Sequence, residues 1–127
     1  MESKIHIDRA IRTVADVFEV WLGVQKTWEF SNPLNIAEEV KSFYCAYLDW
    51  PFRNSRGGSD FGNLLWLNLL AECLNPDVIV DSGAYTGGSA WAVAIGARRA
   101  KVMSFDVDLS RLILRLPRVE HIKADWT

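Results

Sequence analysis

The chain has 127 residues, of which 50% are hydrophobic and 24% are charged, and its formal net charge is −2. These values are typical of one globular domain and argue against a disordered segment. The basic residues are scattered along a slightly acidic chain, which argues against a nucleic-acid partner, because such partners are usually bound by a basic stripe.

The first half of the chain is predicted to be helical. Apolar residues recur at three- and four-residue steps over 8–22 and again over 35–48, as they do on one face of a helix. The segment 61–74 is apolar almost throughout, which predicts a helix that is buried on more than one side. The dipeptide Asn75-Pro76 is expected to end this third helix.

The second half changes to alternating strands and helices. Strands are predicted at 78–80, 101–105 and 119–124, and helices at 89–98 and 109–115. The β-branched run 78–80 is typical of a parallel strand that is buried on both faces. We therefore predict an α/β fold, in which an N-terminal helical segment (1–60) precedes a partial parallel sheet of order β-α-β-α-β (61–127) within one domain overall.

We expect a cytoplasmic protein with no membrane-bound segment. No long apolar run follows a basic start, and no stretch approaches the roughly 18–20 apolar residues that cross a bilayer. Cys45 and Cys73 have apolar or aromatic neighbours and lie outside any CxxC or Cys/His spacing. We expect both to be buried free thiols, and we predict no metal site.

A glycine-rich turn follows the first predicted strand and precedes a helix. It reads Asp81-Ser82-Gly83-Ala84-Tyr85-Thr86-Gly87-Gly88-Ser89. Glycines permit positive φ and close backbone approach, and a helix start offers unpaired N–H groups. Because ligands bind at the carboxyl ends of strands in open α/β sheets, we predict the ligand site here.

Two phosphate-binding motifs fit this turn poorly. A P-loop requires lysine where Ser89 stands, and the dinucleotide fingerprint requires glycine where Tyr85 stands. A dinucleotide-binding oxidoreductase fragment is therefore the least favoured of three functional hypotheses.

The pattern of an acid at a strand end followed by G-x-x-x-G-G resembles the first motif of class I S-adenosylmethionine-dependent methyltransferases. The resemblance continues in Val102-Met103-Ser104-Phe105-Asp106 and in Ile122-Lys123-Ala124-Asp125-Trp126. From about Arg53 onward the chain is also similar to the cephalosporin hydroxylase and macrocin O-methyltransferase group.

The resemblance implies a Rossmann-like region that binds S-adenosyl-L-methionine. It assigns Asp81 to the methionine portion, Asp106 to the ribose hydroxyls and Asp125 to the adenine amino group. The spacing from the turn to Asp106 also fits a ribose contact, with Asp108 as a second candidate. The predicted binding set is completed by residues of the turn. The cofactor is expected to pack closely on the glycines Gly83, Gly87 and Gly88, and the other members of the set are Ser82, Ala84, Tyr85 and Ser89.

The first functional hypothesis is the cofactor-binding half of a methyltransferase that acts on a small molecule such as a sugar or natural product. In this family substrate-binding and catalytic groups come mainly after a fourth strand, so no catalytic residue is predicted and the chain alone is expected to be inactive. An alternative role for Asp81 is to cap the turn or the helix.

The second hypothesis is a non-catalytic α/β module that works by association. The family's sheet has seven strands, whereas three are predicted here, so we expect a truncated domain in which 78–80 lies on an open edge. Such an edge needs cover from the N-terminal helices, from a second copy or partner chain, or from continuing chain.

Overall fold

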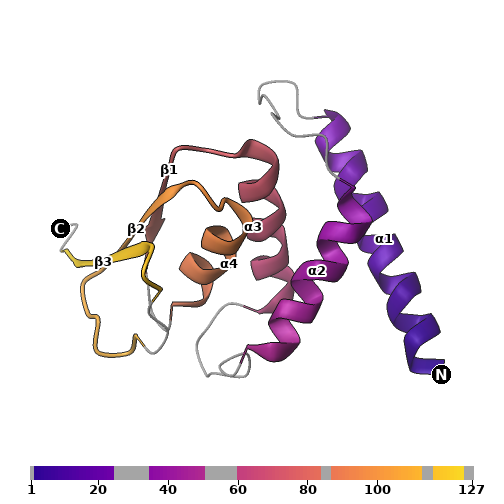
Figure 1. Ribbon diagram of the computed structural model, residues 1–127, viewed down its shortest axis with the longest axis horizontal. Helices are drawn as coiled ribbons and strands as arrows, with labels where there is room; N and C mark the ends of the chain where they lie inside the picture. Colours follow the sequence, from indigo (N-terminus) through magenta and orange to yellow (C-terminus); the bar gives the residue numbers. More distant parts are fainter. Residues whose placement is uncertain (1, 25–34, 51–59, 84–86, 113–115, 125–127) are drawn as a thin grey trace.

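The computed structural model describes residues 2–24, 35–50, 60–83, 87–112 and 116–124, with side chains from His6 onward. Among these residues the elements are, in chain order, α1 (Glu2–Val24), α2 (Ile36–Asp49), α3 (Phe61–Leu74), β1 (Val78–Ser82), α4 (Gly88–Gly96), β2 (Lys101–Asp106) and β3 (Val119–Lys123). The strands form one parallel sheet of order β1-β2-β3 (Figure 1). The predicted α/β class with a small partial parallel sheet is therefore confirmed.

Side-chain caps fix where α2 and α3 begin. The Asn35 side chain accepts a hydrogen bond from the backbone N–H of Glu38 at 3.3 Å, and Asp60 accepts from that of Asn63 at 2.9 Å. Both bonds satisfy N–H groups that a helix start leaves without a partner. At its other end α3 stops at Asn75, which takes a left-handed conformation with φ 46°.

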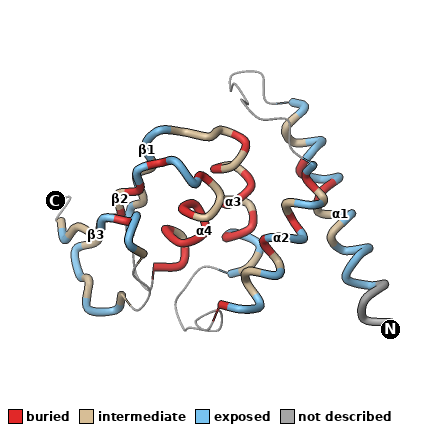
Figure 2. Tube along the Cα trace, viewed as in Figure 1, coloured by how far each residue is buried: buried red, intermediate tan, exposed pale blue. Residues whose placement is uncertain are grey.

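The helices pack one behind another on one side of the sheet. Helix α4 packs on β1 and β2, α3 packs on α4, and α2 and α1 follow on the far side of α3 (Figure 1). Buried residues accordingly concentrate in α3 and α4 and on the inner sides of α1 and α2 (Figure 2). The start of α4, at Gly88 and Ser89, therefore lies between β1 and the helices before it in the chain.

The described elements cover only one face of the sheet. Exposure alternates along β1, where Val78 is 51% and Val80 is 58% exposed, while Ile79 packs against the α3 and α4 side. The prediction that 78–80 is buried on both faces was therefore wrong for the described structure. Strand β1 does lie at the sheet edge, as expected, and α1 and α2 pack away from it.

The connection from β2 to β3 differs from the short helix predicted at 109–115. Residues 107–112 form bends and turns, with the Leu112 N–H donating to the Leu109 carbonyl at 3.1 Å, and 113–115 lie outside the described residues. The Arg118 guanidinium at the end of this connection donates to the carbonyls of Ala94 and Arg98. A cation is favourable there because the carbonyls at a helix C-terminus carry partial negative charge.

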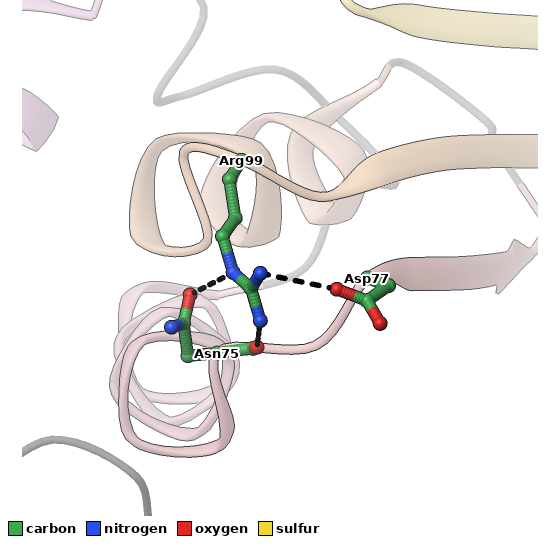
Figure 3. A network of polar contacts seen from close by, with 3 residues as sticks. All are labelled: Asn75, Asp77 and Arg99. Atoms are coloured by element: carbon green, nitrogen blue, oxygen red, sulfur yellow. Dashed lines mark hydrogen bonds and ion pairs between the residues drawn. The ribbon is translucent and has the colours of Figure 1, made fainter.

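Arg99 links the connection from α4 to β2 with the connection from α3 to β1, at the amino ends of the two strands (Figure 3). Its guanidinium donates to the Asn75 side-chain oxygen at 3.0 Å and to the Asn75 carbonyl at 2.9 Å, and it pairs with Asp77 at 3.2 Å. These contacts hold the end of α3 beside the end of α4, opposite the glycine turn.

The two cysteines are free but differ in environment. Cys73 is buried in α3, and burial raises the pKa of its thiol to about 11. Cys45 is exposed on α2, so the expectation that both are buried was wrong for Cys45. Its side chain lies on the outer side of an amphipathic helix whose buried positions are Ile36, Val40 and Phe43. None of the described helices combines the length and the apolar character needed to cross a membrane.

Candidate functional site

The carboxyl ends of β1 and β2 meet at one edge of the sheet. Ser82 is paired with Phe105, and the Gly83 N–H donates to the Phe105 carbonyl at 2.7 Å. The first glycine of the turn is therefore tied to the residue immediately before Asp106. The acid at the end of β2 and the turn at the end of β1 are neighbours, as the sequence predicted.

The glycines of the turn are required for two different structural reasons, backbone conformation and packing. Gly83 and Gly87 have φ values of 89° and 100°, which residues with a side chain rarely adopt. A Cβ at Gly83 would meet nothing within 4 Å, so the space beside it is open. Gly88 is needed for packing instead, because a Cβ there would lie 3.0 Å from the ring of Trp50.

Helix α4 begins without a side-chain cap. Its N-cap is Gly87, which has no side chain that could accept a hydrogen bond from the helix, and its first turn contains no acidic residue. The N–H groups of the first turn and the positive end of the helix dipole favour an anionic or electron-rich group at this position.

The Asp81 carboxylate is engaged within the protein. Its Oδ1 accepts from the Ser89 hydroxyl at 2.8 Å, and its Oδ2 accepts from the Ser104 hydroxyl at 2.7 Å. Ser89 lies in the first turn of α4, whereas Ser104 is fully buried in β2. Asp81 thus connects three elements at the base of the turn.

The acids after β2 differ in their contacts. The half-buried Asp106 accepts from the backbone N–H of Asp108 at 3.2 Å, and its carbonyl accepts from Ala124 at 2.9 Å. Asp108 is exposed and accepts from the Ser110 N–H at 2.9 Å, a bond that lowers the pKa of the Asp108 carboxyl. Asp108 therefore shapes the loop, and Asp106 is the acid beside the glycine turn.

The structure brings together most of the predicted binding residues. Those at the carboxyl edge are Asp81, Gly83, Gly87, Gly88, Ser89 and Asp106. Ser82 is also at this edge, but it is exposed and alternates with Asp81 toward the other face of β1. Ala84, Tyr85 and Asp125 lie outside the described residues.

Two residues that support this site were not predicted from the sequence. Ser104 is a polar residue within the otherwise apolar run 102–105, and that interruption was a usable signal. Trp50, whose ring lies against Gly88, had no comparable signal because its contact depends on how α2 packs on α4.

A second group of polar residues lines a groove between α2, α3 and the end of α4. Its volume is about 210 Å³, and its polar side chains include Glu39, Ser42, Glu72 and Arg98. Burial raises the pKa of Glu72 to about 7, with further increases from a hydrogen bond to Glu39 and from the charge of Glu39, while Arg98 opposes them. This pair of carboxyls lies near the amino ends of the strands, away from the glycine turn.

The free energy of unfolding is expected to fall between about pH 4.5 and pH 7 because of Glu72. A carboxyl with a raised pKa in the folded state contributes stability that is fully present below its unfolded value and is lost as the pH rises through the folded value. Because Glu72 is only partly buried, we expect a loss on the order of 1 kcal/mol.

This dependence is measured by urea unfolding at several pH values. Glu72→Gln should flatten the profile and make the protein more stable than the wild type above pH 7, whereas the exposed Glu19 on α1 offers the control Glu19→Gln. A difference between Glu72→Gln and the wild type that does not change with pH would contradict the expectation.

Within the described residues no three side chains of His, Cys, Asp or Glu lie close enough together to hold a metal ion. No match to this chain was found among protein-family models, curated proteins or solved structures. The resemblance to methyltransferases therefore stays a prediction, and a function has to be supported by the geometry of the carboxyl edge.

Proposed function

We propose that this chain is the cofactor-binding part of a class I methyltransferase that acts on a small molecule of the sugar or natural-product type. In this proposal S-adenosyl-L-methionine lies at the carboxyl edge of the sheet, over the turn from Gly83 to Gly88. When bound, this group supplies the methyl attached to its sulfonium centre.

The observation that carries the proposal is the position of Asp106 beside the turn, set by the bond from the Gly83 N–H to the Phe105 carbonyl. A carboxylate accepts hydrogen bonds from two ribose hydroxyls at once. The open space at Gly83 and the start of α4 without a side-chain cap support the proposal further, because they leave room for a ligand next to the N–H groups of a helix start.

Calorimetric titration with S-adenosylhomocysteine tests this function. We expect micromolar binding by the wild type and a loss of about 10–100-fold in affinity for Asp106→Ala, because a hydrogen bond to a charged acceptor contributes about 1.5–3 kcal/mol. Asp108→Ala is the matched control: this acid follows Asp106 closely, but it is exposed and bonds to Ser110. Its affinity should stay within about threefold of the wild type.

NAD⁺ serves as the control ligand, because the remaining enzyme hypothesis is a dinucleotide-binding oxidoreductase fragment. Binding of NAD⁺ in preference to S-adenosylhomocysteine would replace the proposal by that alternative. A folded chain that binds neither compound would reject both cofactor-binding functions.

A specific observation favours a second candidate function, an α/β module that works by association. Val78 and Val80 are exposed on an edge strand, and apolar parallel edges are rarely left uncovered. Sedimentation of the wild type and of Val80→Lys separates the possibilities: an oligomer that dissociates in the variant supports association through β1, and a monomer in both rejects self-association.

A further inference from the structure

The Asp81 carboxylate forms a bridge between two serine hydroxyls, which we call the Ser89–Asp81–Ser104 bridge. Strand β1 supplies the acid, α4 supplies Ser89 and β2 supplies Ser104, with both hydrogen bonds at 2.7–2.8 Å. Each carboxylate oxygen therefore accepts a hydrogen bond from one serine hydroxyl of the protein. Hydrogen bonds to a charged acceptor of this kind are stronger than those between neutral groups.

Ser104 has a particular need for this bond. Its side chain is fully buried in the middle of β2, and a buried hydroxyl without a partner costs free energy. The parallel register pairs Asp81 with Ser104, so both side chains lie on the face that α4 covers. The carboxylate is consequently held on the inner side of the strand ends.

Ser89 connects the same carboxylate to the beginning of α4. Gly83 and Gly87, which precede it, both have positive φ, and glycine gives a backbone little rigidity of its own. The bond from the Trp91 N–H to the Gly87 carbonyl, at 3.0 Å, starts the helix just after this turn. The bridge therefore fixes the distance between the uncapped helix start and the sheet.

We propose that Asp81 is a positioning residue, which holds the start of α4 against the strand ends through Ser89 and Ser104 and does not itself contact the bound nucleoside or its amino-acid portion. This inference rests on the proposed function, because it concerns the same site. It differs from the role that the family resemblance implies for Asp81, namely a contact with the methionine portion of the ligand.

Two ligands separate positioning from direct contact. S-adenosylhomocysteine carries the amino-acid portion, whereas 5′-methylthioadenosine lacks it and keeps the adenine and ribose. We expect Asp81→Asn and Ser104→Ala each to weaken the binding of both ligands by about tenfold, because both variants loosen the same link between the start of α4 and the strand ends. Since Ser104 is fully buried, it cannot contact the ligand itself, and its hydroxyl bonds to Asp81.

Hydrogen exchange without ligand gives a readout that does not depend on the proposed function. The N–H groups of Gly83 and Trp91, which bond to Phe105 and Gly87, should exchange at least about fivefold faster in Asp81→Asn and Ser104→Ala than in the wild type. Ser110→Ala, in the exposed loop after β2, should leave both rates unchanged. If Asp81→Asn does not fold, Ser89→Ala removes the other arm of the bridge and carries the same expectation.

Direct contact predicts a different pattern and would overturn the inference: Asp81→Asn would weaken S-adenosylhomocysteine alone, and Ser104→Ala would leave both affinities unchanged. If the wild type binds neither ligand, the proposed function fails, and the exchange rates then decide the positioning role separately. Unchanged exchange in the Asp81 and Ser104 variants would reject the bridge as a positioning device.

Discussion

Replacing Trp91 with alanine is expected to lower the free energy of unfolding by about 3–5 kcal/mol, the usual cost of removing a large buried aromatic side chain. Trp91 is buried in α4 and stacks on Trp50, with ring centroids 4.6 Å apart and planes inclined by 9°. The ring of Phe43 on α2 lies 5.4 Å away. One side chain therefore joins the helix that follows the glycine turn to the N-terminal helices.

Urea unfolding, monitored by circular dichroism, measures this effect. Small domains are stable by only about 5–15 kcal/mol, so the alanine variant should lose a large part of its stability. Trp91→Phe keeps an aromatic ring against Trp50 and should cost less than half as much. A loss below about 1 kcal/mol for Trp91→Ala would show that the stacked pair is not a principal part of the core.

The helices and strands were largely predictable because their signals are local. The predicted third helix, 61–74, agrees with α3, since Asp60 supplies a cap and Asn75-Pro76 a stop. Strand β1 extends past the predicted 78–80 to Ser82, because the backbone of Asp81 and Ser82 continues to pair with β2 although their side chains are polar. Hydropathy describes side chains, and it therefore misplaced the end of that strand.

The contacts that build the site were less predictable because they join segments that are distant in sequence. The sequence identified Asp81 and Asp106 as strand-end acids, but only the register of β1 on β2 brings Ser104 to the Asp81 carboxylate. The pairing of Glu39 with Glu72 likewise requires α2 to pack on α3 in a particular orientation. A run of three apolar residues at 78–80 also gives no information on whether one face of a strand is covered or both.

Gly96→Ala is expected to destabilise the fold by about 3 kcal/mol, at the upper end of the usual cost of overpacking. A Cβ at this position would lie 2.5 Å from the backbone oxygen of Asn68 and 3.0 Å from its side-chain nitrogen. That oxygen belongs to the backbone of α3, so it cannot move away unless the two helices separate. Separation would also stretch the buried bond from the Asn68 amide to the Ala92 carbonyl, now 2.9 Å.

Gly23→Ala is the matched control, because Gly23 lies in the last turn of α1 and a Cβ there would meet nothing within 4 Å. Alanine forms helices more readily than glycine, so this variant should gain up to about 1 kcal/mol. Chemical unfolding of both variants therefore separates the effect of helix propensity from that of the contact between α3 and α4. Equal stability of Gly96→Ala and the wild type would mean that α4 is not held at this distance from α3, and the position of the glycine turn at its other end would then need another support.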